Sequence, residues 1–84
     1  MQRYRVELTL RKAEGALMRA LGTTERRGFR PIAVDAESGA VSGTGTADCW
    51  HLRLSVESER PAALLQTQLE KLYDCLTVEV QPCR

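Results

Sequence analysis

Apolar and polar side chains alternate along several stretches of the chain, which is typical of β-strands with one buried face. The alternation is clearest at residues 50–56 and also covers residues 4–10, while shorter alternating runs lie at residues 32–34 and 76–80. The side chains between the apolar positions are mostly charged or polar. We therefore expect a sheet with one covered face and one polar face.

A first helix is predicted over residues 14–27, where apolar positions recur at the spacing i, i+3, i+4, i+7. This stripe consists of Leu17, Ala20, Leu21 and Thr24. Gly28 follows, and we expect it to adopt the left-handed conformation that ends many helices, with Phe29 folding back onto the last turn.

A second helix is predicted over residues 60–73. Its inner stripe is expected to contain Leu65, Leu69, Leu72 and Tyr73. Ser58 is a suitable N-cap for this helix, and Pro61 suits its first turn.

The order strand, helix, strand, strand, helix, strand predicts an α+β fold, a ferredoxin-like βαββαβ sandwich of two layers. Right-handed crossovers give an antiparallel four-stranded sheet in the order 4-1-3-2, with the Pro31 strand at an edge. Residues 37–48 are rich in glycine, serine and threonine and are predicted to form a hairpin loop between the second and third strands. At 84 residues, the chain is expected to be a single domain spanning residues 1–84.

Charge and composition narrow the class of protein. The 12 basic and 11 acidic residues leave a formal charge of +1, which favours neither nucleic acid nor an anionic membrane as partner. The sequence has no apolar run of the length of a signal peptide or a membrane span. Its three cysteines are widely spaced, which favours reduced thiols. We expect a cytoplasmic protein.

No catalytic or metal site is predicted. Cys49 and His51 would share one face of a strand, but no second pair of ligands completes a zinc site. Gly43 and Gly45 are not followed by a helix, so they do not form a dinucleotide-binding motif. The single histidine has no orienting motif for nucleophilic catalysis, and the chain lacks the asparagine that acylphosphatases of this topology use.

RNA binding is a further possibility, because Arg26, Arg27 and Arg30 surround an Arg-Gly-Phe sequence. RNA-binding sheets of this topology stack bases on aromatic side chains of the open face. The expected open-face positions are instead Arg5, Glu7, His51, Arg53 and Glu57. The arginines at the end of the first helix are explained by their interaction with its negative end.

The motifs Leu-Arg-Lys-Ala-Glu-Gly-Ala-Leu at residues 10–17 and Arg-Gly-Phe at residues 27–29 resemble those of the ACT domain. They are most similar to the small subunits of acetolactate synthase (acetohydroxyacid synthase). The segment at residues 64–74 resembles the short isozyme II subunit in particular, which is a single ACT domain.

This resemblance implies a regulatory subunit that performs no chemistry itself. It would bind the catalytic subunit and activate it in the biosynthesis of valine, leucine and isoleucine. The cofactors thiamine diphosphate, Mg²⁺ and FAD would belong to the catalytic partner, and this chain would hold none. Members of the family pair through the second strand and first helix, so a homodimer through the edge strand near Pro31 is expected.

In valine-sensitive relatives the effector lies at this pairing seam, between the start of the first helix and the second strand. The resemblance therefore implies an effector site made of Lys12, Glu14, Gly15, Ala16, Leu17, Arg30 and Ile32. The N–H groups after Gly15 could hold a carboxylate, although a tight strand-to-helix turn is the preferred explanation of Gly15. Asparagines help to hold the effector in those relatives, whereas this chain has Lys12 and Arg30. Because an amino acid's ammonium would meet positive charge there, we expect weak or no response to valine.

Two alternatives to a regulatory subunit of acetolactate synthase remain. A free-standing ACT sensor would bind an amino acid without any catalytic partner. An RNA-binding module would show strongly salt-dependent affinity for single strands.

Overall fold

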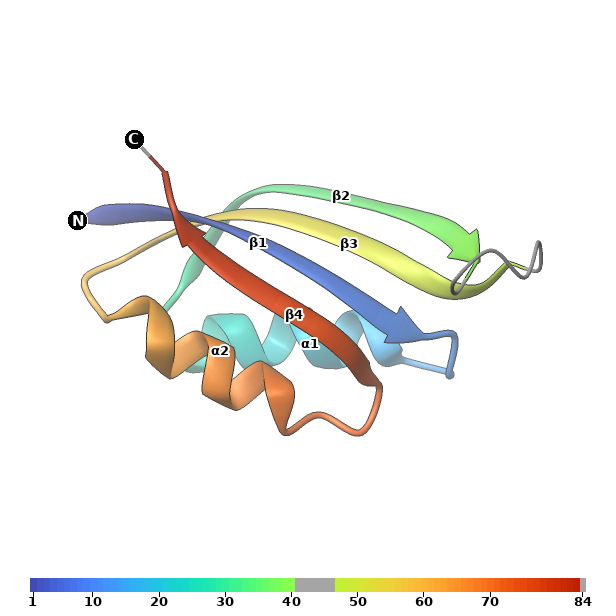
Figure 1. Cartoon of the computed structure of the whole chain (residues 1–84). Helices are drawn as coiled ribbons and strands as arrows, with labels where there is room; N and C mark the ends of the chain where they lie inside the picture. Colours follow the sequence, from blue (N-terminus) through green and yellow to red (C-terminus); the bar gives the residue numbers. More distant parts are fainter. Residues whose placement is uncertain (41–46, 84) are drawn as a thin grey trace.

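The computed structural model describes residues 1–40 and 47–83 of the chain. Four strands and two helices alternate in the predicted order (Figure 1). They are β1 (Gln2–Arg11), α1 (Ala16–Arg26), β2 (Arg30–Ala40), β3 (Ala47–Ser58), α2 (Ala62–Glu70) and β4 (Cys75–Pro82).

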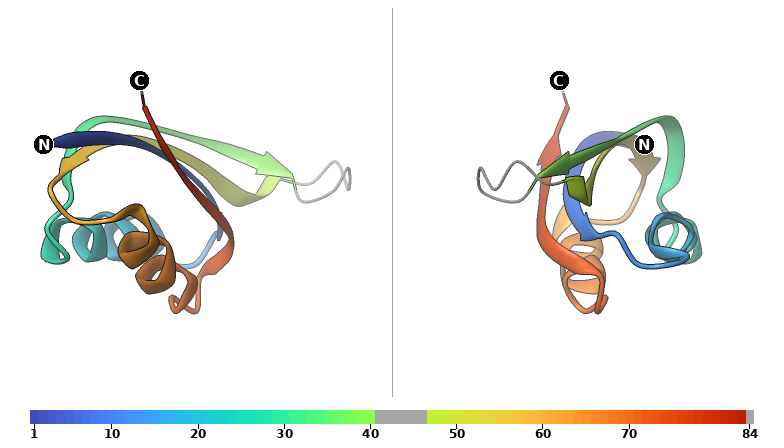
Figure 2. Two further views of the ribbon diagram at one scale, coloured as in Figure 1. Left: turned by 60° about the vertical axis from the view of Figure 1, so that its left-hand side comes forward. Right: turned by 90° about the vertical axis from the view of Figure 1, so that its right-hand side faces the viewer.

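The strands form one antiparallel sheet in the order β2-β3-β1-β4, which confirms the predicted topology. Strands β2 and β4 lie at its edges, and both helices cover the same face (Figures 1 and 2). The fold is thus the two-layer ferredoxin-like sandwich expected from the sequence, with the opposite face of the sheet left open.

The core lies between the sheet and the helices, because the alternation places apolar side chains of the two central strands on the helix side. Tyr4, Val6, Leu8 and Leu10 of β1 face Leu52, Leu54 and Val56 of β3, and all seven are buried. Ala20 of α1, Leu65 and Leu69 of α2, and Phe29 complete this cluster.

Helix α1 ends as predicted. Gly28 has φ 90°, its N–H donates to the Glu25 carbonyl, and the Phe29 N–H donates to the Thr24 carbonyl. These two bonds define a Schellman motif, which satisfies carbonyls at the helix end and turns the chain towards the sheet. Phe29 is fully buried as a result.

Strand β2 is longer than the sequence indicates. Residues 37–48 are predicted to form a loop, but residues 37–40 pair with β3 and belong to β2, and residues 47 and 48 belong to β3. The part of that prediction concerning residues 41–46, including Gly43 and Gly45, lies outside the described residues. Near its start, β2 has a register shift between Pro31 and Ala33, which leaves Ile32 as an extra residue and breaks the simple alternation.

The prediction for the start and end of the second helix is wrong. Helix α2 begins at Ala62, after Pro61, and Ser58 does not cap it. The Ser58 hydroxyl instead donates to the Gly28 carbonyl at 2.7 Å and accepts from the Arg60 N–H at 3.0 Å. At the other end, Tyr73 follows the helix and is 82% exposed, so it is not part of the inner stripe.

Candidate functional site

The first group of predicted effector-site residues lies at the start of α1. Gly15 precedes the helix with φ 77°, a conformation that by itself explains the glycine. Ala16 is buried and Leu17 packs against the core, whereas Glu14 is exposed. Lys12 is exposed and places its Nζ 4.8 Å from the centre of the Trp50 ring.

The second group, Arg30 and Ile32, lies at the start of β2. The Arg30 guanidinium donates to Glu57 at 2.6 Å, and its side chain is 75% exposed. Arg3 binds the other oxygen of the same carboxylate at 3.1 Å. The hydrogen bond from Arg30, followed by that from Arg3, lowers the pKa of Glu57.

The two groups do not meet within one chain. The first group lies at the start of α1, and the second lies just after the end of α1. The 11 residues of this helix span about 16 Å and separate the two groups. A site that contains both groups needs a second protomer, in which the start of β2 lies beside the first protomer's Gly15.

The edge at which a second protomer would pair carries exposed apolar side chains. Met18 of α1 is 72% exposed, and Val34 and Ile32 of β2 are 52% and 46% exposed. Val34 pairs with the buried Leu54, so it lies on the helix side of the sheet, beyond the cover of α1. An exposed apolar edge of this kind is typical of a pairing surface.

The open face of the sheet is polar, as predicted. The Arg53 guanidinium donates to Asp35 at 2.6 Å and to Glu37 at 3.1 Å, which ties β3 to the edge strand β2. The hydrogen bond to Asp35, followed by that to Glu37, raises the pKa of Arg53. These pairs are exposed and contribute little to stability.

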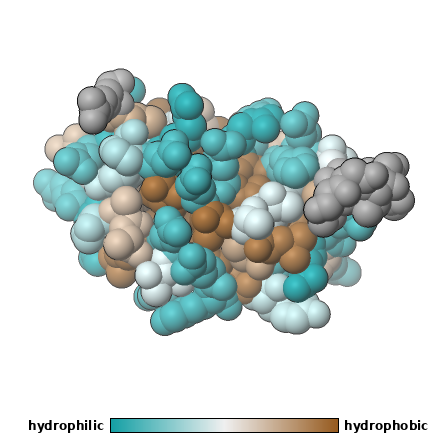
Figure 3. Space-filling model, viewed as in Figure 1, coloured by the Kyte–Doolittle hydropathy of each residue, from teal (hydrophilic) through white to brown (hydrophobic). Residues whose placement is uncertain are grey.

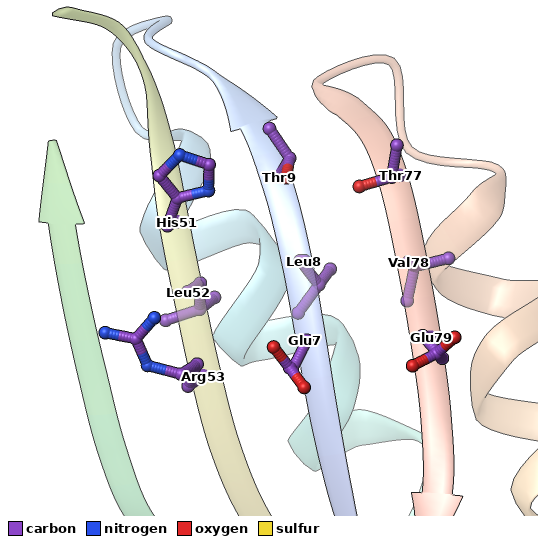
Figure 4. A pocket seen from close by; sticks show the side chains of 9 residues that line it. All are labelled: Glu7, Leu8, Thr9, His51, Leu52, Arg53, Thr77, Val78 and Glu79. Atoms are coloured by element: carbon purple, nitrogen blue, oxygen red, sulfur yellow. The ribbon is translucent and has the colours of Figure 1, made fainter. Parts of the chain in front are cut away.

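A shallow hollow of about 320 Å³ lies over strands β1, β3 and β4 on this face (Figure 4). Glu7 of β1 and Glu79 of β4 are directly paired in the register, so two carboxylates lie on neighbouring strands. His51 lies at the same face, and its ring covers Gly39 so closely that a side chain there would collide with it. The hollow carries charge, and the residues that line it include neither serine nor cysteine.

Cys49 and His51 are neighbours on this face, with Sγ 3.9 Å from Nε2. Cys49 is buried and its thiol donates to the Gly39 carbonyl at 3.2 Å. Within residues 1–40 and 47–83, no group of three histidine, cysteine, aspartate or glutamate side chains is placed to hold a metal.

Stacking aromatics are not found on the open face in the part of the chain that the structure describes. The central positions Arg5, Glu7, His51, Arg53 and Glu57 lie there as the alternation predicts. Arg27-Gly28-Phe29 precedes β2, and Phe29 is buried in the core. The base-stacking platform of RNA-binding sheets is therefore missing from these positions.

Two contacts at the far end of β1 have no signal in the sequence pattern. Arg19 Nε and Asp74 Oδ2 are 2.7 Å apart, and the Asp74 side chain is only 4% exposed. The hydrogen bond from Arg19 lowers the pKa of Asp74, and burial opposes it. Arg11 stacks over Tyr73, with Cζ 5.3 Å from the ring centre. Both pairs join residues more than 50 positions apart. The pairing of β4 with β1 brings Tyr73 to Arg11, and the packing of α1 on the sheet places Arg19 beside Asp74.

A profile described as "ACT domain" matches residues 12–78, well over half of the chain. Among solved structures, the fold is similar to the solution structure of the C-terminal domain of the MgtC protein from Mycobacterium tuberculosis. That similarity has a TM-score of 0.67 at 14% identity and covers 99% of this chain and 88% of the other, so it concerns the fold alone. A search of curated proteins found no match. Neither α1 nor α2, the helices of the described part, has the length and apolar character needed to span a membrane.

Proposed function

Because the chain belongs to the ACT-domain family, whose members are regulatory and ligand-sensing modules, we propose that it is the regulatory small subunit of acetolactate synthase. In this role it binds the thiamine-diphosphate-dependent catalytic subunit in the cytoplasm and raises the rate of the first common step of branched-chain amino-acid synthesis. It contributes no catalytic group of its own. Thiamine diphosphate, Mg²⁺ and FAD belong to the catalytic partner.

The observation that carries this proposal is the family match over residues 12–78 together with the structural roles of the subunit-like motifs. Gly15 and Gly28 both adopt left-handed backbone conformations at the two ends of α1. Asp74, the last residue of the segment that resembles the isozyme II subunit, is buried and paired with Arg19. The motifs on which the resemblance rests thus include positions where the fold restricts the residue type.

The proposal includes a homodimer through β2 and α1. Its support is the free edge of β2 with the exposed side chains of Met18, Ile32 and Val34. An antiparallel pair of β2 strands would extend the sheet across both protomers and cover these side chains.

The proposed effector site lies at the seam of this dimer, with Lys12 and Gly15 of one protomer near Arg30 and Ile32 of the other. The Arg30 guanidinium is engaged by Glu57, and Lys12 stacks on Trp50. Neither offers an acceptor to the ammonium of an amino acid. We expect the response to valine to be weak or lost, and a saturable shift of activity or melting temperature at millimolar valine would contradict this.

The test is acetolactate formation by the purified catalytic subunit of the same organism, with its three cofactors present, while this protein is titrated in. The proposal expects a saturable rise in rate and a complex on size-exclusion chromatography. A Phe29→Ser variant, which loses a fully buried core residue, serves as the matched control and should not activate. No rise in rate and no complex with the folded wild-type chain would refute the proposal.

A free-standing amino-acid sensor is the second candidate, because the ACT family match is compatible with it. It predicts that an amino acid raises the melting temperature of the isolated chain, with no catalytic partner present. An RNA-binding module is less well supported, given the open-face residues described above. It predicts affinity for single strands that falls steeply with salt.

A further inference from the structure

The aromatic residues of this chain are unevenly distributed. The sequence has one tryptophan, one phenylalanine and two tyrosines. Tyr4 and Phe29 are buried in the core with their ring centres 6.1 Å apart. Trp50 and Tyr73 lie at the end of the sheet where β1 stops. Trp50 is half-buried and packs against the core, whereas Tyr73 is 82% exposed.

Each of these two rings lies beneath a cation, and the two cations are consecutive in the sequence. Arg11 Cζ lies 5.3 Å from the centre of the Tyr73 ring, and Lys12 Nζ lies 4.8 Å from the centre of the Trp50 ring. The backbone holds this arrangement, since the Arg11 N–H donates to the Asp74 carbonyl at 2.7 Å and its side chain donates to the Tyr73 carbonyl at 3.3 Å.

The sheet register places the two aromatic residues on opposite sides of β1, at the end of that strand. Leu10 pairs with Trp50 on one side and with Cys75 on the other, and Tyr73 lies two residues before Cys75. Leu76, the next residue of β4, is 36% exposed. Hydrophobic residues reach the surface along β4 between hydrophilic ones (Figure 3).

The two cations have no carboxylate partner among residues 1–40 and 47–83. The carboxylate of Asp74, which follows Tyr73, is bound by Arg19 at 2.7 Å. A guanidinium stacked on a ring keeps its outer N–H groups available, and a carboxylate is the partner that binds them most strongly.

We propose that Arg11, Lys12, Trp50, Tyr73 and Leu76, together the Tyr73 surface, form a protein-docking site for an acidic segment with apolar side chains beside its carboxylates. Tyrosine, tryptophan and arginine are the residue types most enriched where binding energy concentrates in protein interfaces. The inference rests on the proposed function, in which the acidic segment belongs to the catalytic subunit.

The location of the Tyr73 surface is compatible with the proposed dimer. Lys12 is shared with the proposed effector site. The rest of the Tyr73 surface lies at the end of β1, the start of β3, the turn before β4 and the start of β4, whereas the free pairing edge is β2. One protomer can therefore dock its Tyr73 surface while β2 pairs with a second copy. Two cations on a chain of net charge +1 are too few for tight binding to a nucleic-acid backbone, so a protein partner is favoured.

The experiment compares Tyr73→Ala and Arg11→Gln with wild type by titrating each into the catalytic subunit and fitting Kd from activation and from calorimetry. Arg5→Gln is the matched control, because Arg5 is an exposed arginine on the same strand with no aromatic contact among the described residues. We expect each surface variant to raise Kd by about tenfold or more, and the control by less than about twofold. Because both surface side chains are mainly exposed, their melting temperatures should stay close to that of wild type.

The outcomes separate this inference from the function on which it rests. Wild-type activation with unchanged Kd for both surface variants would overturn the docking site and keep the regulatory function. A wild-type chain that neither binds nor activates would overturn both. Equal losses in the Arg5→Gln control would show that general charge, and not the Tyr73 surface, carries the affinity, and would also overturn the inference.

Discussion

Gly28 occupies a backbone position that few other residues tolerate. Its φ is 90°, and a β-carbon added there would lie 2.7 Å from Arg60 Nε. We expect Gly28→Ala to lower the free energy of unfolding by roughly 1–2 kcal/mol, because the left-handed backbone becomes strained and Arg60 must move. Chemical denaturation followed by circular dichroism measures this loss.

Gly22→Ala is the matched control for that prediction. Gly22 lies inside α1, and an added β-carbon would approach only the mobile guanidinium of Arg26, at 3.0 Å. Alanine favours the helix by about 0.5–1 kcal/mol over glycine, so this variant should be more stable than wild type. Equal destabilisation by both substitutions would contradict the role given to the Gly28 backbone.

Asp74 links stability to pH through its ion pair with Arg19. The hydrogen bond from Arg19 holds the pKa of Asp74 below its usual range in the folded protein. The unfolded chain therefore binds the proton more readily, and the pair stabilises the fold above the unfolded pKa of about 3.9. This contribution is lost as pH falls through the lower, folded pKa.

Asp74→Asn should accordingly be less stable than wild type near neutral pH, with a difference that shrinks below about pH 4. Urea midpoints measured across this range test the expectation. Glu79→Gln removes an exposed carboxylate of the open face and should change the dependence of the urea midpoint on pH only slightly. A difference between Asp74→Asn and wild type that is constant with pH would show that the ion pair is not its cause.

At the scale of elements, the chain between β3 and α2 is held by contacts to a different element. Ser58 is buried at the end of β3, and its hydroxyl donates a hydrogen bond to the Gly28 carbonyl. This bond links the end of β3 to the turn that follows α1. The Tyr4 hydroxyl donates to the Arg60 carbonyl at 3.0 Å and adds a link to β1. The two turns at this end of the sandwich therefore form one connected structure.

Ser58→Ala should destabilise the whole fold by about 1 kcal/mol, because it removes the hydrogen bond from the Ser58 hydroxyl to the Gly28 carbonyl and the one that this hydroxyl accepts from the Arg60 N–H. If Ser58 capped α2, the loss would appear as reduced helix content before global unfolding. We expect instead an unchanged helical signal and a lower midpoint in thermal or chemical denaturation. Ser55→Ala is the control, at a half-buried position of the same strand, and should change the midpoint of denaturation only slightly.

At the scale of the molecule, the two edges of the sheet differ in what they expose. Strand β2 is free along the side that faces away from β3 and carries Val34 on its uncovered helix-side surface. Strand β4 is the other edge, and α2 packs beside it. The proposed dimer uses the first edge and leaves the second for other contacts.

Val34→Lys should convert the proposed dimer to monomers while the fold is retained, because a charge at a pairing edge opposes association and an exposed position tolerates it. Sedimentation velocity measures the oligomeric state, and circular dichroism checks the fold. Gln81→Lys on β4 is the control and should remain dimeric. A Val34→Lys chain that still sediments as a dimer would move the proposed interface away from β2.

The sequence by itself determined the features that depend on near neighbours in the chain. The alternation at residues 4–10 and 50–56 predicted the two central strands, because side chains of a strand point to opposite faces in turn. The helix end at Gly28 and Phe29 was equally predictable, since one glycine and one apolar residue define that motif locally. The sheet order followed from these elements and the handedness of their connections.

The tertiary structure alone decided the features that depend on distant partners. Ser38 and Gly39 have turn propensity, but pairing with β3 extends β2 through them, and the His51 ring occupies the space above Gly39. Ser58 has the propensity of a helix cap, yet its hydroxyl donates to the carbonyl of Gly28, which follows α1 and is 30 residues away in the sequence. The tertiary structure also places Lys12 and Arg30 at opposite ends of α1. This separation explains why the candidate effector site is complete only across two protomers.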